Sequence, residues 1–138
     1  MKYLVVGLGN IGAEYTNTRH NIGFRVLDAL AEASNISFTT VRYGAMATLK
    51  HRGRTILLLK PSTYMNLSGK AVRYWMEQER IPRENLLVIS DDIALPFGTF
   101  RMRKNGSEGG HNGLRSITEM LGDNQYVRLR FGVGGDFP

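Results

Sequence analysis

Short apolar runs that are typical of strands alternate with amphipathic helical stretches along the whole chain. We expect strands over residues 2–7, 41–50, 55–60, 86–90, 99–103 and 127–133, and helices over residues 22–33, 68–79 and 112–121. In the first of these helices Val26, Leu27 and Leu30 form one apolar stripe, the pattern of a helix that buries a single face. Strands that alternate with helices predict an α/β domain with a mixed sheet.

Length and composition favour one globular domain over residues 1–138. A chain of 138 residues is of ordinary length for one domain and can bury a sizeable core. It has no cysteine, which excludes a disulfide scaffold, a thiol enzyme and a cysteine-based zinc site. Its apolar runs, such as residues 56–59, are too short to span a bilayer, and residues 1–6 are typical of a strand rather than a signal peptide. We therefore expect a soluble cytoplasmic protein with no membrane partner.

The chain is basic, and the excess charge is concentrated in its last third. It carries 18 Lys and Arg against 12 Asp and Glu, a net charge of +6 at pH 7. The basic residues between positions 101 and 130 are Arg101, Arg103, Lys104, Arg115, Arg128 and Arg130. Such a field attracts polyanions such as RNA, but a solvated cationic surface accounts for the charge equally well. Charge alone leaves both interpretations open.

Polar loops follow three of the predicted strands, at residues 8–21, 61–67 and 91–97, and a fourth loop at 104–111 precedes a helix. In α/β sheets, ligands bind beyond the carboxyl ends of the strands. If these loops meet at one edge of the sheet, they build one site. The polar residues they would contribute are Asn10, Tyr15, His20, Asn66, Asp91 and Asn112.

The glycines of residues 7–12 match the G-x-G-x-x-G pattern of dinucleotide-binding proteins and follow a predicted strand. That site also requires a helix that begins at once, whereas residues 13–20 have no apolar helical stripe. A dinucleotide site is therefore the weaker interpretation. We expect these glycines to allow a tight turn and a close approach of the backbone to a ligand.

A histidine and a carboxylate are candidates for acid–base chemistry. His20 stands at the end of a polar loop, and Asp91 follows the predicted central strand. A carboxylate that accepts from one ring nitrogen fixes the tautomer, so that the other nitrogen can deprotonate water. A lone histidine is more often structural, so this pair remains a hypothesis at this point. Asp91 and Asp92 should point to opposite faces of a strand, and no metal-binding motif is present, so we expect no metal.

Three asparagines each stand at the junction of a loop and a predicted element: Asn10, Asn66 and Asn112. Any one of them could be an ordinary cap or turn residue. As a group beside a His/Asp pair, their amides suit recognition of a peptide backbone and stabilisation of a developing oxyanion.

Four blocks of the sequence carry a resemblance to bacterial peptidyl-tRNA hydrolases. The blocks are residues 7–12 with Tyr15 and 18–21, residues 60–70, residues 91–98, and residues 109–114. They extend over nearly the whole chain in the order and spacing of that family. The resemblance implies a three-layer α/β/α domain with a twisted mixed sheet, which hydrolyses the ester between peptide and tRNA and so recycles tRNA.

The resemblance also implies roles for individual residues. His20 resembles the general base that activates water, Asp91 the carboxylate that supports it, and Asn10 the residue that distinguishes an acylated amine from a free one. Tyr15, Tyr64, Asn66 and Asn112 match positions that contact the substrate. Arg101, Arg103, Arg128 and Arg130 lie where the family has basic residues for the tRNA acceptor arm. No metal or organic cofactor is expected, and we expect a monomer.

The chain departs from the family pattern at three places. Ile11 stands where proline is usual, and Ala94 replaces a common acidic residue. Family members usually continue beyond the region of Pro138 with another strand and a C-terminal helix, so the C-terminal part is expected to be missing.

Two other functions remain as alternatives. A non-catalytic RNA-binding module, made inactive by truncation, would keep the basic residues and tyrosines but would show no turnover. A nucleotide-dependent enzyme that uses residues 7–12 would bind NAD or NADP.

Overall fold

The structure, a computed structural model, describes residues 1–9, 21–92, 94–106 and 111–133. Its strands are β1 (Lys2–Gly7), β2 (Thr39–Val41), β3 (Gly44–His51), β4 (Arg54–Pro61), β5 (Leu86–Asp92), β6 (Phe100–Arg103) and β7 (Val127–Gly132). Its α-helices are α1 (Ile22–Ala33), α2 (Ser68–Glu79) and α3 (Asn112–Leu121), with short 3₁₀ turns η3 (Met65–Leu67) and η4 (Arg83–Asn85).

All the strands join one sheet in the order β2-β3-β4-β1-β5-β7-β6. The central strands β4, β1, β5 and β7 are parallel, whereas β2, β3 and β6 run antiparallel to their neighbours. The mixed sheet is therefore as predicted. Because β1, β4 and β5 are parallel, their carboxyl ends lie at the same edge of the sheet.

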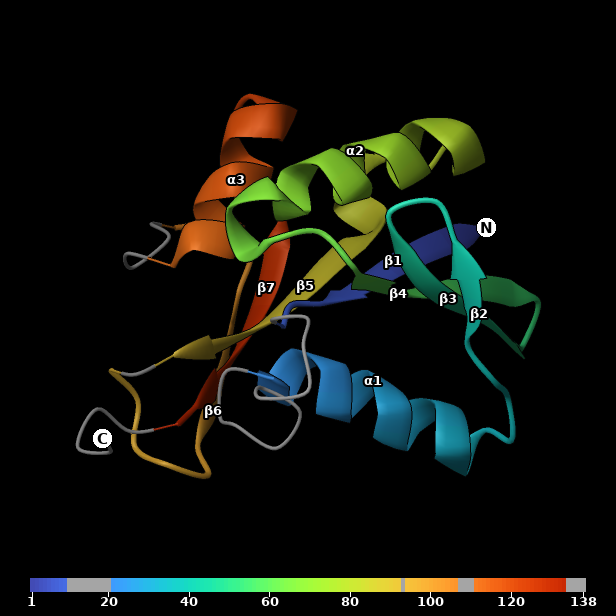
Figure 1. The fold of residues 1–138 in the computed structure, drawn as a ribbon, viewed down its shortest axis with the longest axis horizontal. Helices are drawn as coiled ribbons and strands as arrows, with labels where there is room; N and C mark the ends of the chain where they lie inside the picture. Colours follow the sequence, from blue (N-terminus) through green and yellow to red (C-terminus); the bar gives the residue numbers. More distant parts are fainter. Residues whose placement is uncertain (10–20, 93, 107–110, 134–138) are drawn as a thin grey trace.

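Helices cover both faces of this sheet, with α2 and α3 on one side and α1 on the other (Figure 1). The two faces have separate apolar cores because the side chains of a strand alternate. Leu4 and Val6 of β1 pack into the core under α2 and α3, whereas Val5 packs against the core under α1. The predicted three-layer α/β/α architecture is confirmed.

Two glycines allow α1 to lie against β1. A Cβ at Gly7 would lie 2.3 Å from the carbonyl oxygen of Gly23, and a Cβ at Gly23 would lie 2.3 Å from the carbonyl oxygen of Leu8. Among the described residues the first helix begins at Ile22, well after Gly7. Gly7 therefore serves the packing of strand on helix; residues 10–12 of the glycine pattern lie outside the described part of the chain.

The predicted helices agree with the structure, but two of the strands differ. β5 continues to Asp92 instead of ending at Ser90, because Asp91 and Asp92 still pair with Phe131 and Gly132 of β7. The strand predicted over residues 41–50 is in fact the end of β2, a turn and β3, since Tyr43 adopts a left-handed conformation with φ of 66°.

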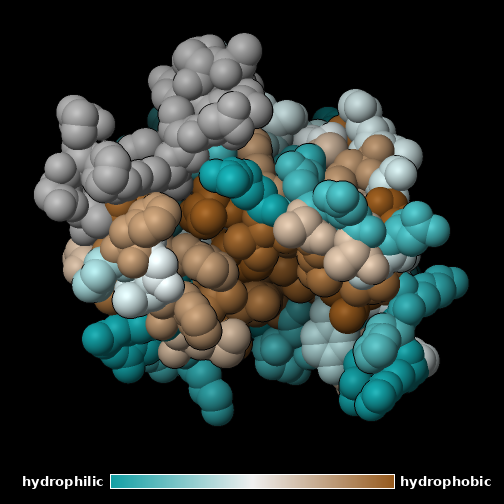
Figure 2. All heavy atoms as spheres, turned by 90° about the horizontal axis from the view of Figure 1, so that it is seen from below, coloured by the Kyte–Doolittle hydropathy of each residue, from teal (hydrophilic) through white to brown (hydrophobic). Residues whose placement is uncertain are grey.

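Hydrophobic residues also gather on the surface of the α1 side, where Figure 2 shows an apolar area between hydrophilic rims. Leu129 and Phe131 of β7 belong to this side and are only partly buried. Phe100 of β6, which is 65% exposed, packs its ring against Phe131 with 5.9 Å between the centroids. None of the helices in the described ranges is both long and apolar enough to cross a membrane.

Candidate active site

The segments that follow β4 and β5 and precede α3 supply polar side chains to one edge of the sheet. Asp91 is near the end of β5, Tyr64 and Asn66 lie between β4 and α2, and Asn112 is the first residue of α3. The sequence prediction that these segments share an edge is confirmed for these residues. The candidates Asn10, Tyr15 and His20 lie outside the described residues, as does the expected contact between Asp91 and His20.

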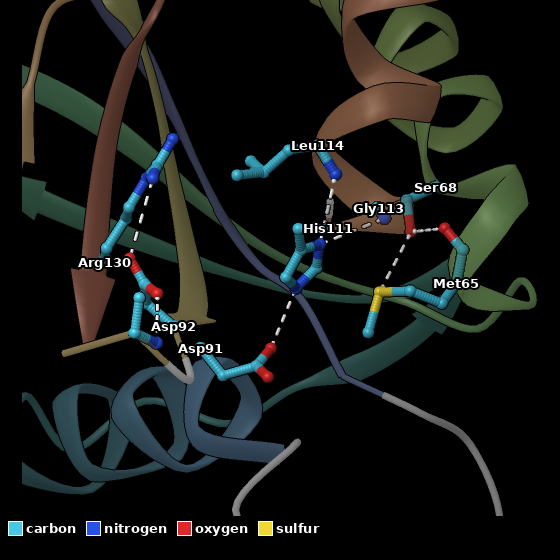
Figure 3. Close-up of polar contacts among 9 residues, drawn as sticks. Met65, Ser68, Asp91, Asp92, His111, Gly113, Leu114 and Arg130 are labelled. Carbon is cyan, nitrogen blue, oxygen red and sulfur yellow. Dashed lines mark hydrogen bonds and ion pairs between the residues drawn. The ribbon is translucent and has the colours of Figure 1, made fainter. Parts of the chain in front are cut away.

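Asp91 is a buried carboxylate in contact with a histidine. Its side chain is 6% exposed, and its Oδ1 lies 2.8 Å from Nε2 of His111, whose side chain is 13% exposed (Figure 3). A carboxylate removed from water requires hydrogen-bond donors, because an unpaired buried charge is strongly unfavourable. His111 is one such partner, because its Nε2 lies within hydrogen-bond distance of Oδ1.

His111 is also the N-cap of α3. Its Nδ1 accepts hydrogen bonds from the backbone N–H groups of Gly113, over 3.1 Å, and Leu114, over 3.3 Å. The first N–H groups of a helix have no partner within the helix, so a side-chain acceptor at this position stabilises the first turn. Serine, threonine, aspartate and asparagine usually fill this role; here an imidazole does so.

The turn η3 packs against the start of α3. A Cβ at Gly113 would lie 2.7 Å from Sδ of Met65, so a larger residue here would require this methionine to shift. Ser68 holds the turn in place, since its Oγ donates to the carbonyl oxygen of Met65 over 2.8 Å. Asn66 and Asn112, the neighbours of Met65 and Gly113 in the chain, are thereby brought to the same place and are both exposed.

Asp91 and Asp92 have different partners, as expected for neighbours on a strand. Oδ1 of Asp92 accepts from the backbone N–H of Ala94 over 2.8 Å, and its Oδ2 lies 3.6 Å from Nη1 of Arg130. No group of three or more potential metal ligands occurs among the residues that the structure describes.

The arginines of β6 and β7 stand opposite one another in the antiparallel ladder. Arg101 pairs with Arg130 and Arg103 with Arg128, so these side chains share one face of the ribbon, as the two-residue spacing predicted. Arg101 and Arg103 are exposed.

Arg128 differs from the other three arginines, because it is 0% exposed. Its guanidinium lies 4.2 Å from the centroid of the Tyr126 ring, and Nη2 donates to the carbonyl oxygen of Asn124 over 2.7 Å. A side chain without exposed surface offers nothing to a phosphate, so of these four arginines only Arg101, Arg103 and the partly buried Arg130 contribute to a basic surface.

A family model described as peptidyl-tRNA hydrolase matches residues 4–137. The chain belongs to the peptidyl-tRNA hydrolase family. The peptidyl-tRNA hydrolase of Phocaeicola vulgatus is 67% identical over 138 residues, which are 100% of this chain and 74% of the relative. That of Porphyromonas gingivalis is 60% identical over 137 residues, covering 99% of this chain and 74% of the relative.

Solved structures of peptidyl-tRNA hydrolase have the same fold. The crystal structure of peptidyl-tRNA hydrolase from Acinetobacter baumannii superimposes with a TM-score of 0.92 at 36% sequence identity. The match covers 99% of this chain and 70% of that chain.

In this member of the peptidyl-tRNA hydrolase family, His111 is the site residue that the sequence prediction missed. The signal was present, because residue 111 immediately precedes the predicted helix at 112–121 and so occupies the N-cap position. Histidine is not a preferred N-cap residue, and the proximity of Asp91, 20 positions earlier, depends on the tertiary fold.

Proposed function

We propose that the chain hydrolyses the ester bond that joins the peptide to tRNA in peptidyl-tRNA and so returns tRNA to use. The observation that carries this proposal is the family match over residues 4–137, together with a buried carboxylate at the sheet edge where the matching segments meet. A non-catalytic RNA-binding module would not account for a carboxylate, Asp91, that is buried against a histidine. It would also not account for the exposed asparagines beside this pair.

Water is the nucleophile in the proposed reaction, and His20 is its general base. His20 takes a proton from water as the oxygen attacks the ester carbonyl carbon, and Asp91 stabilises the imidazolium that forms. Collapse of the tetrahedral intermediate breaks the bond to the tRNA oxygen, which receives a proton. The products are the peptide carboxylate and tRNA with a free hydroxyl group.

The course of the chain near His20 supports its pairing with Asp91. Asn21, which follows His20 in sequence, is 3% exposed at the start of α1. A Cβ at Gly23 would lie 2.9 Å from the carbonyl oxygen of Ile89, two residues before Asp91. The chain therefore passes beside the end of β5 just after His20.

The amides and tyrosines of this edge recognise the peptide end of the substrate in this proposal. Asn10, Asn66 and Asn112 bind the peptide backbone and the reacting carbonyl, since an amide side chain both donates and accepts. Tyr15 and Tyr64 contact the substrate beside them; Tyr64 is 73% exposed and free to do so.

The exposed arginines of the β6–β7 ribbon bind the acceptor arm of tRNA. Arg101 and Arg103 face solvent, and Arg130 lies in the same row of side chains. Contacts of this kind neutralise phosphates and release counterions. A general base and polar groups suffice for ester hydrolysis, so the proposed reaction needs no metal or organic cofactor. We further propose that the protein acts in the cytoplasm, where charged tRNA is used, as a monomer.

Release of N-acetyl-amino acid from N-acetyl-aminoacyl-tRNA tests the proposal. We expect turnover by the chain, and a loss of about 10²–10⁴-fold in kcat for His20→Ala, with tRNA binding and the unfolding midpoint unchanged. Asp91→Asn should lose less than His20→Ala, because the base remains. tRNA binding without turnover would support the RNA-binding alternative, and near wild-type turnover by His20→Ala would remove His20 from the mechanism.

A further inference from the structure

His111 uses both of its ring nitrogens at once. Nδ1 faces the start of α3 and accepts from the N–H groups of Gly113 and Leu114, while Nε2 lies 2.8 Å from Oδ1 of Asp91. Figure 3 shows the imidazole between the first turn of α3 and the carboxylate at the end of β5. The ring therefore connects two elements that lie 20 residues apart in the sequence.

The start of α3 selects one tautomer of His111. A nitrogen that accepts hydrogen bonds from two N–H groups carries no proton, so the proton of the neutral ring is on Nε2. A proton on Nδ1 would point at two donors and at the positive end of the helix dipole. With the proton on Nε2, the imidazole donates to Asp91, and the hydrogen bond to an ionised acceptor is of the strong kind.

We propose that His111 is a positioning residue: its Nε2–H tautomer, fixed by capping α3, holds Oδ1 of Asp91 and sets the orientation of the catalytic carboxylate. This inference rests on the proposed function. With Oδ1 held, the plane of the carboxylate and the place of Oδ2 are determined. The burial of both side chains leaves little water to compete for Oδ1, so the His111 contact restrains the rotation of the group.

Close packing keeps the ring in this place. A Cβ at Gly113 would lie 3.0 Å from Cε1 of His111 as well as 2.7 Å from Sδ of Met65. The absence of a side chain at Gly113 thus leaves room for both the imidazole and the thioether of Met65. The turn that carries Asn66 and the helix that carries Asn112 meet beside this glycine.

The variant His111→Asn separates the two roles. Asparagine is a preferred N-cap, since its side-chain oxygen accepts from the same backbone N–H groups, but it is too short to reach Asp91 as well. We expect kcat to fall about 10- to 100-fold, the effect of a misplaced catalytic group. The urea unfolding midpoint should fall less than in His111→Ala, because the cap remains while the buried Asp91 loses one donor. KM for N-acetyl-aminoacyl-tRNA should stay the same. Glu119→Gln, an exposed change on the same helix, is the control and should leave both properties unchanged.

A double-mutant cycle with Asp91→Asn distinguishes positioning from a general structural effect. If His111 acts through the carboxylate, His111→Asn should lower kcat little further once Asp91 is replaced. An equal loss in both backgrounds would overturn the proposal, and so would wild-type kcat for His111→Asn alone. His111→Ala, which removes the cap as well, should lower the unfolding midpoint further.

Nitrogen NMR of the histidine rings gives a readout independent of turnover. The signals that disappear in His111→Asn should show a protonated Nε2 and an unprotonated Nδ1. The opposite tautomer would overturn the proposal even in an active enzyme. If the wild-type chain hydrolyses no N-acetyl-aminoacyl-tRNA, the proposed function itself fails, which is a different result from an active chain that is insensitive to His111→Asn.

Discussion

The backbone N–H of Gly69 in α2 donates a hydrogen bond to Oγ of Ser116 in α3 over 2.8 Å. A Cβ at Gly69 would lie only 2.2 Å from the carbonyl oxygen of Ser116. The two helices therefore touch backbone to backbone at this point. The same helix α3 begins at the His111 cap. The contact with α2 therefore also holds in place the helix that carries His111 at its start.

Gly69→Ala should destabilise the protein. The added methyl group must push the two backbones apart, which costs about 1–3 kcal/mol of the free energy of unfolding. Ser116→Ala should cost a similar amount, about 1–3 kcal/mol, because it leaves the buried N–H of Gly69 without its acceptor. Urea unfolding measures both. Gln78→Ala, exposed on α2, should change the free energy by less than about 0.5 kcal/mol. A Gly69→Ala variant as stable as the wild type would contradict the close contact.

Asn10→Asp should narrow the preference for substrates with a blocked amine. An N-acetylated substrate presents an amide, whereas an aminoacyl-tRNA presents an ammonium group that a carboxylate would attract. The ratio of kcat/KM for N-acetyl-aminoacyl-tRNA to that for aminoacyl-tRNA, measured in both proteins, should fall in the variant. An unchanged ratio would remove Asn10 from the recognition of the amine.

Arg103→Glu should weaken binding of the tRNA body without affecting the chemistry. We expect a higher KM, an unchanged kcat, and a salt dependence of log(kcat/KM) that is flatter by about one unit of slope, as for the loss of one phosphate contact. A short model ester without tRNA should be hydrolysed equally by variant and wild type. The exposed Arg54, which begins β4 at the opposite end of that strand from the site, supplies the matched control Arg54→Glu.

The result for Arg103 decides between a tRNA contact and a solvated strand face. Arg54→Glu changes the net charge equally, so a shift shared by both variants would reflect the overall charge of the protein. Unaltered KM and salt slope for Arg103→Glu would move the proposed contact to Arg101 or Arg130.

Asp123 should make the stability of the protein depend on acidic pH. The hydrogen bond from the backbone N–H of Gln125 holds the pKa of the Asp123 carboxyl below its usual value, and the Arg83 guanidinium also lowers it. A carboxyl with a lowered pKa in the folded state stabilises that state above its unfolded-state pKa, and this contribution is lost as the pH falls through the folded-state pKa. Asp123→Asn should therefore be less stable than the wild type near pH 7 and equally stable in strong acid. Urea unfolding at both pH values measures this, and a difference that persists in acid would contradict it.

Apolar periodicity alone predicted the three helices, because each buries one stripe against the sheet. It did not predict β2 as a separate strand. The turn before β3 depends on a left-handed conformation at Tyr43, and tyrosine is not a typical residue for such a turn. It ended β5 at Ser90 because Asp91 and Asp92 are charged, although their backbones continue the ladder with β7. Polar side chains at the functional edge of a sheet interrupt the apolar pattern, so the predicted strand ends before the observed one.

The sequence predicted which segments meet at the site, but it did not predict which of their side chains are in contact. His111 was missed because histidine is not a preferred N-cap residue and because its contact with Asp91 is made by the fold. Arg128 was expected on the basic surface because its spacing from Arg130 is that of a shared face. Its burial over Tyr126 depends on tertiary packing, which spacing along the strand does not report.

The first strand of the chain occupies the middle of the sheet, between β4 and β5. During synthesis β1 leaves the ribosome before β5, yet it pairs with Leu86–Ile89 of β5, which are made about 80 residues later. At roughly 5–20 residues per second, β1 waits about 4 to 16 seconds before both its edges can be paired. An enzyme that acts on peptidyl-tRNA is thus itself a nascent chain in which one edge of the apolar strand β1 stays unpaired until β5 has been made.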